Sequence, residues 1–182
     1  MLPLPHRCLL LPAAAFLLAP SAPAARHRAF ELTLAGLRPG VTRLQDALRR
    51  FGPRWSHPSG DERDIYRWYD ARRRLEISIE VKSSGVLSYV SVWRRRARLV
   101  SAPLPAAADR TGRGLRLGDR PTRAIALYGR PFFSGPSTLD ARPVLFYSFN
   151  FSWAGANQPQ ILECSFNAAR RLVKMTLSAD YY

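Results

Sequence analysis

The sequence predicts an α+β fold built from two tandem repeats, each with one helix followed by three strands. The first observation is a stretch that occurs twice: residues 36–55 read GLRPGVTRLQDALRRFGPRW, and residues 114–133 read GLRLGDRPTRAIALYGRPFF. The second is that three segments of alternating apolar and polar residues follow each copy, as strands with one buried face require. Because half of the chain is small for an independent core, we expect two antiparallel meander sheets side by side, covered on one face by helices.

Each copy of the repeated stretch carries the signals of one short amphipathic helix. In the first copy, Thr42 and Gln45 have the spacing of a capping box, and Gly52 can end the helix in a left-handed conformation. In the second copy, Asp119 is the expected N-cap, and Gly129 ends the pattern. The expected apolar stripes are Leu44, Ala47, Leu48 and Phe51 in the first helix, and Ala124, Ile125, Leu127 and Tyr128 in the second.

The first repeat continues with three predicted strands, at 65–70, 75–81 and 86–93. The run 75–81, LEISIEV, alternates most regularly, with aliphatic residues on one side and Glu and Ser on the other. A loop rich in Pro, Ser and Gly precedes the strands at 52–64, and Lys-Ser-Ser-Gly makes a tight turn at 82–85. Short turns between consecutive strands predict an antiparallel meander.

The second repeat continues in the same way, with predicted strands at 144–153, 161–167 and 171–178 and loops at 130–143 and 154–160. Its one cysteine is interpreted as a small buried hydrophobic residue, because no second cysteine or nearby histidine supports a nucleophile. We expect the apolar sides of the strands to lie on one covered face. The residues of this face are Leu75, Ile77, Ile79, Val81, Leu145, Tyr147, Phe149, Cys164, Phe166, Val173, Met175 and Leu177.

The N-terminal segment predicts export. Arg7, an apolar run at 8–18 and the small-residue pattern Ala22-Pro23-Ala24 follow one another as in secretory signal peptides. A membrane anchor is the alternative, but the apolar run is shorter than the roughly 20 residues that span a bilayer. We therefore expect a protein of the periplasm or the cell exterior, with no membrane span after cleavage. The expected domains are a signal peptide at 1–24, a first repeat at 25–96, a linker at 97–113 and a second repeat at 114–182.

The composition is strongly basic. The net charge is +15, and nearly all of the positive charge is arginine, since Lys82 and Lys174 are the only lysines. Such a charge attracts anionic lipid, glycan or an acidic partner. A bias of GC-rich coding toward Arg, Ala, Pro and Gly explains the same composition without a ligand, and both interpretations stay open. Nucleic acid is not an expected partner of an exported protein.

Two arginine clusters and three aromatic residues are the candidate binding residues. In a meander, the turn between the first two strands and the exit of the third lie at the same end of the sheet, so the clusters should meet there. The alternative is a solvated edge whose charges keep strands from associating. Aromatic residues left exposed in loops would form an interaction surface. The candidates are Arg72, Arg73, Arg74, Arg94, Arg95, Arg96 and Arg98, with Trp55, Phe132 and Phe133 as the aromatic residues.

No pattern for catalysis, a metal or a cofactor is found in the sequence. His27 and His57 have no companion ligands at zinc spacing, and GDERD at 60–64 lacks the ligand spacing of a calcium loop. Ser137 and Asp140 have no histidine in their loop. We therefore expect no catalytic residue, no metal site and no cofactor, and an uncharacterised hydrolase is the least favoured alternative.

The order of the motifs resembles that of the small outer-membrane-assembly lipoproteins of the SmpA/OmlA type. A tandem of such units also resembles the β-lactamase inhibitor protein, which the same superfamily includes. The chain departs from both patterns, because it lacks the lipid-bearing cysteine of the former and the intrarepeat disulfides of the latter. The resemblance implies helix–three-strand units and a binding role, and no partner-contact residue transfers. The residues that carry it are Gly40-Val41-Thr42-Arg43, Gly52-Pro53, LEISIEV, VLSYVSV, Gly129-Arg130-Pro131 and LECSFN.

Together these observations predict an exported, non-catalytic binding protein of the cell envelope. The first hypothesis is that it engages a protein partner through its sheet face and loops. The alternative is a binder of anionic envelope lipid or glycan phosphate through the arginines. Salt separates the two, because ionic contacts made by exposed arginines weaken steeply as salt screens them. The sequence leaves the oligomeric state open.

Overall fold

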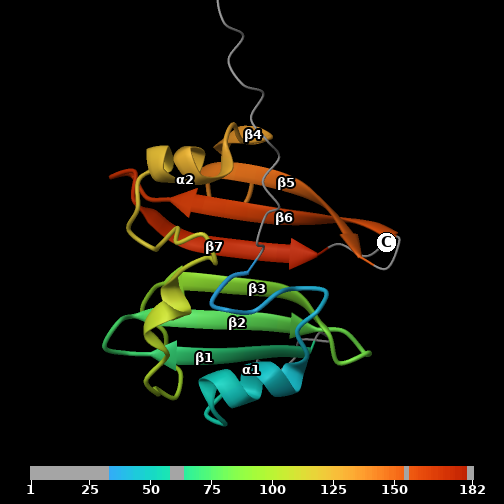
Figure 1. Ribbon diagram of the computed structural model, residues 1–182. Coiled ribbons are helices and arrows are strands. Elements are labelled where there is room, and N and C mark those ends of the chain that lie inside the picture. The colour runs from blue at the N-terminus through green and yellow to red at the C-terminus, as the bar shows by residue number, and fades with distance from the viewer. Residues whose placement is uncertain (1–32, 58–63, 154–155, 180–182) are drawn as a thin grey trace, which may run out of the picture.

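The computed structural model describes residues 33–57, 64–153 and 156–179 (Figure 1). The predicted signal peptide, 1–24, and the first residues of the predicted first repeat lie outside the described residues. Within the described ranges, none of the helices has the length and apolar character needed to cross a membrane. The elements are α1 (Leu44–Phe51), β1 (Asp64–Asp70), β2 (Leu75–Val81), β3 (Leu87–Arg94), a 3-10 helix η1 (Ala106–Asp109), α2 (Pro121–Tyr128), β4 (Phe133–Pro136), β5 (Pro143–Trp153), β6 (Ala156–Phe166) and β7 (Leu172–Ala179).

The strands of the described residues form one antiparallel sheet of seven, in the order β1-β2-β3-β7-β6-β5-β4. The two halves of the chain join at the β3–β7 pair, where Tyr89 lies opposite Ser178 and Trp93 opposite Lys174. This finding corrects the predicted fold, because the meanders are not two separate sheets placed side by side. The physical reason is that β3 and β7 would each be an edge with unpaired backbone groups, and pairing them satisfies both rows.

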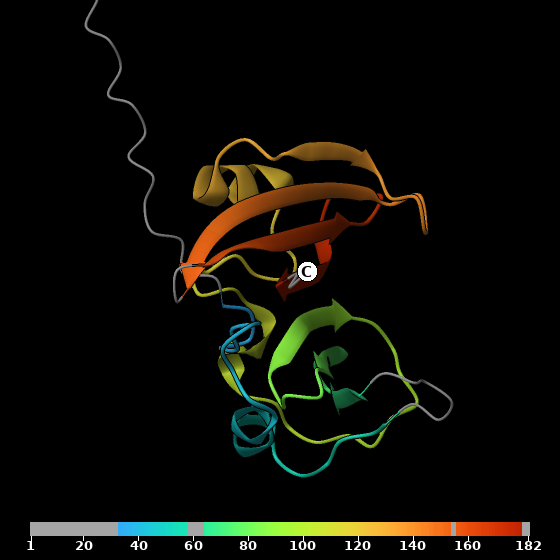
Figure 2. The ribbon, with the colours of Figure 1, turned by 90° about the vertical axis from the view of Figure 1, so that its right-hand side faces the viewer.

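The predicted cover by helices is also wrong, because the helices are too short to cover such a sheet. Each helix has eight residues, which is about 12 Å of α-helix, whereas the sheet measures roughly 30 Å across its strands. Figure 2 shows both helices on the same side of the sheet, next to connecting segments without regular structure. These segments, 33–43 and 97–120, complete the cover with the buried residues Leu34, Ala35, Leu37, Leu104, Ala108, Leu115 and Leu117.

The helices pack onto the covered face mainly through the predicted apolar stripes. Phe51 of α1 and Tyr128 of α2 are buried. The ring centroid of Phe51 lies 5.3 Å from that of Trp68, and the ring centroid of Tyr128 lies 5.5 Å from that of Tyr147. Ile125, expected in the second stripe, is instead 44% exposed. Ile125 lies at the margin of the helix face formed by the buried residues Ala124 and Tyr128.

Both helices have their N-cap one residue later than predicted. The N-cap of α1 is Arg43, whose backbone N–H donates to Asp46 Oδ2 at 3.2 Å. The hydroxyl of Thr42, expected as the cap, accepts instead from a backbone N–H of the preceding turn. The N-cap of α2 is Arg120 rather than Asp119.

Strand β2 confirms the predicted range, and the other predicted strands differ from the observed ones at their ends. Strand β4, FSGP, was not predicted, because Gly and Pro weaken the pattern of a strand. Strand β6 begins at Ala156, inside a predicted loop. A register shift where β6 meets β7 leaves Val173 only partly buried, and Leu172 takes its place in the core.

Candidate functional site

The two predicted arginine clusters lie at one end of the sheet. Strand β1 ends and β2 begins at this end, and β3 leaves the sheet there, because the three strands are antiparallel neighbours. The backbone N–H of Arg95 donates to the carbonyl oxygen of Arg74 at 2.9 Å and so joins the clusters directly. We call the surface formed by residues 71–74 and 94–98 the basic end. Its role in binding remains a prediction.

The chain that follows the basic end is fastened to the outer edge of β1. The backbone N–H of Ala71 donates to Ser101 Oγ at 3.0 Å, and that of Ala102 donates to the carbonyl oxygen of Tyr69 at 2.9 Å. On the same edge, Ser56 forms an antiparallel bridge with Arg67. The turn at 71–74 is therefore held from both sides, by Ser101 on the outer edge and by the backbone of Arg95 on the inner side.

Three of the seven clustered arginines hold the fold together. The guanidinium of Arg73 donates to the carbonyl oxygen of Pro105 at 2.9 Å. Arg95 makes two hydrogen bonds, of 2.8 and 3.1 Å, with the buried carboxylate of Glu76. Arg94 reaches a carbonyl oxygen of the segment before α2 at 3.4 Å. Because internal acceptors hold these side chains, they are poor candidates for contact with a ligand.

The other four arginines of the basic end are exposed. Within the described part of the chain, the side chains of Arg72, Arg74, Arg96 and Arg98 have no hydrogen bond or ion pair. Arg96 and Arg98 protrude because every second residue of this extended segment faces solvent. These four side chains are the ones that an outside anion could contact.

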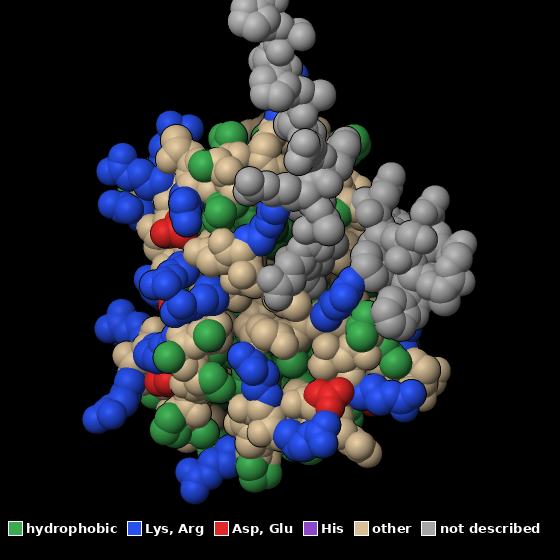
Figure 3. Space-filling model, in the orientation of Figure 1, with side chains coloured by type: hydrophobic (Ala, Val, Ile, Leu, Met, Phe, Trp, Pro, Cys, Tyr) green, Lys and Arg blue, Asp and Glu red, His purple; other side chains and the backbone are tan. Residues whose placement is uncertain are grey.

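The second half of the chain adds arginines that sequence reasoning missed. Strand β7 begins at the same end as the β1–β2 turn, because it pairs antiparallel with β3, and the segment just before it carries Arg170 and Arg171. Arg120 also lies there, since the backbone N–H of Leu172 donates to the carbonyl oxygen of Asp119 at 2.8 Å. Figure 3 shows Lys and Arg side chains gathered along the left side of the view, where Figure 1 shows β1 ending and β2 and β7 beginning. Only the β3–β7 pairing reveals this neighbourhood.

The aromatic candidates lie away from the basic end, with Trp55 at one edge of the sheet and Phe132 and Phe133 at the other. Trp55 packs beside β1, with its ring centroid 4.7 Å from that of Tyr66. Phe132 and Phe133 lie at β4, the opposite edge of the sheet. Phe132 is 85% exposed, and Leu139 in the following turn is 93% exposed. The structure therefore separates the aromatic candidates from the arginines.

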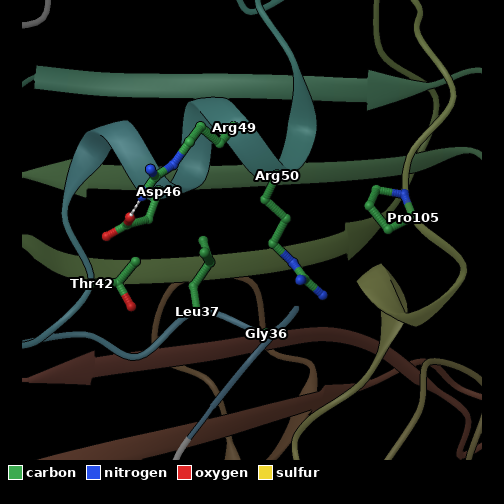
Figure 4. A pocket seen from close by; sticks show the side chains of 7 residues that line it. All are labelled: Gly36, Leu37, Thr42, Asp46, Arg49, Arg50 and Pro105. Atoms are coloured by element: carbon green, nitrogen blue, oxygen red, sulfur yellow. Dashed lines mark hydrogen bonds and ion pairs between the residues drawn. The ribbon is translucent and has the colours of Figure 1, made fainter.

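A hollow of about 540 Å³ beside α1 is a second candidate site, and its polar groups are already occupied. The Arg50 side chain points toward Gly36 (Figure 4), and its Nε donates to the carbonyl oxygen of Ala35 at 2.7 Å. Asp46 pairs with Arg49, and this hydrogen bond holds the pKa of the Asp46 carboxyl below its ordinary value. The site is therefore not placed in this hollow, whose lining is Gly36, Leu37, Thr42, Asp46, Arg49, Arg50 and Pro105.

Of the residues considered for catalysis or metal binding, Cys164 is buried, Ser137 and Asp140 are engaged locally, and His57 is exposed, whereas His27 and residues 60–63 lie outside the described residues. Burial raises the pKa of the Cys164 thiol, which keeps it protonated and sheltered from solvent. Ser137 Oγ accepts from the backbone N–H of Leu139, and Asp140 pairs with Arg142 at 3.3 Å. Among the described residues, no group of three or more His, Cys, Asp or Glu side chains could hold a metal.

The fold is thus a single antiparallel sheet with two short helices on one face and a basic end. No family model matches the chain, and no curated protein matches it. A solved structure of a DUF4309 family protein, YjgB from Bacillus subtilis subsp. subtilis str. 168, is similar, with a TM-score of 0.49 and 14% identity over 80% of this chain and 83% of that chain. The candidate site rests on the geometry of this chain alone.

Proposed function

We propose that this protein is an exported, non-catalytic binding protein that attaches to an anionic surface through its basic end. The observation that carries the proposal is the set of four exposed arginines, Arg72, Arg74, Arg96 and Arg98, which have no partner among the described residues. Exposed guanidinium groups bind phosphate oxygens with two parallel hydrogen bonds, which a lysine ammonium cannot do. Envelope lipids and glycans that carry phosphate are surfaces of this kind.

The way charges pair at the basic end favours a binding role for its exposed arginines over the alternative that coding bias alone placed them there. Asp70 accepts from the backbone N–H of Arg73 at 3.1 Å, and Glu76 is paired with Arg95. The acidic groups nearby are therefore engaged with structural arginines or with the backbone beneath them. No described carboxylate pairs with the four exposed arginines, and the arginines of the second half add to the same positive potential.

A protein partner is the second candidate function. Phe132 and Leu139 are large, apolar and exposed, and both flank β4, which pairs with β5 alone among the described strands. An edge strand with exposed apolar neighbours suits the addition of an extended segment of a partner. The resemblance to the SmpA/OmlA-type family agrees with this candidate, which needs no contribution from the arginines.

The test of the first candidate compares two variants with the same change in net charge. One replaces Arg72, Arg74, Arg96 and Arg98 by Gln, and leaves Arg94 and Arg95 intact so that buried Glu76 keeps its partner. Each basic residue near an anionic membrane contributes about 1 kcal/mol, so binding to anionic vesicles at low salt should weaken by more than about a hundredfold. Flotation with anionic and neutral vesicles at two salt concentrations measures this loss.

The control variant replaces four exposed arginines outside the basic end by Gln: Arg43, Arg49, Arg54 and Arg130. It should lose far less vesicle binding, and both variants should unfold at the parent's urea midpoint. An equal loss in the two variants would mean that net charge alone attracts the protein. If vesicle binding survives in the first variant while Phe132→Ser removes a salt-resistant protein partner, the second candidate replaces the first.

A further inference from the structure

The face of the sheet opposite the helices holds a separate group of cations, centred on Trp93. Side chains alternate along a strand, so Trp93 lies on the opposite face from buried Val92. The registers of β2, β3 and β7 place Glu76, Trp93 and Lys174 in one row across this face. The row lies close to the basic end, but its side chains are not the four exposed arginines.

Three cationic groups surround the Trp93 indole. Arg95 Cζ lies 4.2 Å from the ring centroid, Arg142 Cζ lies 5.5 Å from it, and Lys174 Nζ lies 5.6 Å from it. We call these four residues the Trp93 cluster. The indole attracts each cation, while the three cations repel one another. Such a cluster offers an anion several donors that the fold has already gathered.

The three cations differ in how much of their hydrogen-bonding capacity is used. Arg95 is held by both oxygens of Glu76. The Arg142 guanidinium has one contact with Asp140, at 3.3 Å, and both of these side chains are more than a third exposed. Lys174 has no ion pair or hydrogen bond from its ammonium within the described residues. Donors of Lys174 and Arg142 are therefore available to a ligand.

One buried hydroxyl on the same face also has no partner. Thr176 lies two residues after Lys174 on β7, hence on the same side, and only 8% of it is exposed. Its Oγ1 has no hydrogen bond among the described residues. The carboxylate of Glu163, opposite Thr176 in the register, accepts instead from the hydroxyl of Ser165 at 3.1 Å. The Thr176 oxygen is itself buried, so the proposed site does not include it.

We propose that the Trp93 cluster is a binding site for a single phosphodiester group. The oxygens of a tetrahedral phosphodiester accept from Lys174 and Arg142 together, and the indole packs against the carbon skeleton beside the phosphorus. A group with one negative charge fits better than a dianion, because Glu76, Asp140 and Glu163 already place negative charge around the cluster. This site goes beyond the proposed function, since it uses other residues and recognises one chemical group rather than a charged surface.

The experiment uses the full chain and glycerophosphoglycerol, a soluble phosphodiester. The two lysines, Lys82 and Lys174, can be ¹³C-methylated without loss of charge and observed separately by NMR. Lys82 is the matched control, because it lies in the β2–β3 turn at the other end of the sheet. On titration we expect the Lys174 signal to shift and the Lys82 signal to stay in place.

Calorimetry with variants tests whether Lys174 and Arg142 bind the phosphodiester. Lys174→Gln and Arg142→Gln should each weaken binding of glycerophosphoglycerol at least tenfold, and Lys82→Gln should leave it unchanged. Repeating the titration with vesicles that present the same headgroup distinguishes a lipid ligand from a soluble one. Tighter binding to the vesicles that still depends on Lys174 would identify the ligand as a lipid. Equal binding would identify it as a soluble phosphodiester.

Three results would overturn the proposal. The Lys174 signal could remain fixed up to millimolar phosphodiester, or inorganic phosphate could bind more tightly than the diester, which contradicts the charge argument. The third result is loss of phosphodiester binding in the variant of Arg72, Arg74, Arg96 and Arg98 with no loss in Lys174→Gln, which assigns the ligand to the basic end. If the basic end does not bind vesicles, the expected shift of the Lys174 signal is unaffected. The two proposals can therefore be contradicted independently.

Discussion

The two halves of the chain make the same contact between turn and helix with the donor and acceptor exchanged. In the first half, Arg50 on α1 donates to the carbonyl oxygen of Ala35 at 2.7 Å. In the second half, Arg113 occupies the position equivalent to Ala35 and donates at 2.7 Å to the carbonyl oxygen of Leu127, which occupies the position equivalent to Arg50. Each guanidinium also lies near the aromatic residue that ends its helix. In both halves an arginine–carbonyl hydrogen bond thus ties the turn to the helix, with the arginine on the helix in the first half and on the turn in the second.

The glycines beside these contacts are equivalent in sequence and differ in what they permit. Gly36 and Gly114 both have positive φ, of 77° and 82°. A Cβ on Gly36 would lie 2.4 Å from the guanidinium of Arg50, whereas a Cβ on Gly114 would meet no atom within 4 Å. In the first half glycine leaves room for a neighbour's side chain, and in the second half only the backbone conformation requires it. Glycine is thus needed at positions 36 and 114 for different reasons.

The largest expected effect tests whether the halves are one folding unit. Ile77→Ala in β2 and Leu162→Ala in β6 each remove a buried side chain from the covered face. Each should cost about 2–5 kcal/mol of unfolding free energy. Because the strands share one sheet, both variants should shift a single urea transition, followed by tryptophan fluorescence and by circular dichroism. Two transitions, each sensitive to one variant only, would show that the halves fold independently.

A smaller effect separates the two glycines. Gly114→Ala should cost about 1–2 kcal/mol, the usual penalty for a side chain in the left-handed region. Gly36→Ala should cost more, because the new Cβ also displaces Arg50 from Ala35. Urea unfolding of Arg50→Ala alone and combined with Gly36→Ala measures the difference. If Arg50→Ala costs as much in the Gly36→Ala background as in the parent, the displacement does not occur.

The smallest effect is an alkaline loss of stability that originates in the second half. Burial raises the pKa of the Cys164 thiol, so the folded protein keeps a proton that the unfolded chain loses. Stability should therefore fall as pH rises above the ordinary thiol pKa of about 8.5, by at most about 1.4 kcal/mol per pH unit. Cys164→Ala should flatten the slope between pH 8 and 10. Val90→Ala, a core control in the first half, should lower stability and leave the slope unchanged.

Local patterns predicted the elements that depend on local physics. The alternation of LEISIEV matches β2, and the meander rule brought the turn after β1 to the exit of β3, as the hydrogen bond between Arg95 and Arg74 shows. Phe51, which belongs to the predicted apolar stripe of the first helix, is buried. Each of these inferences needs only the chain direction and the period of the side chains.

The pairing of strand edges could not be predicted in the same way. The residues of β3 and β7 do not indicate which strand each will pair with. The single sheet, and the position of Arg170 beside the basic end, were therefore not predicted. The spacing of Trp93, near the end of β3, and Arg95, just beyond it, was visible in the sequence. The approach of Arg142 was not, because two strands of the sheet, β6 and β7, lie between β5 and β3.

The two outer edges of the sheet have opposite consequences for self-association. Along β1, Ser56 and Ser101 already occupy backbone groups that an incoming chain would need. Strand β4 leaves its outer side unpaired by any described strand, and it is only four residues long with Pro136 at its end. A second molecule that paired with β4 would offer its own β4 and use up both open edges. Growth by edge pairing would thus stop at two copies, and the covered edge protects the protein from forming fibres.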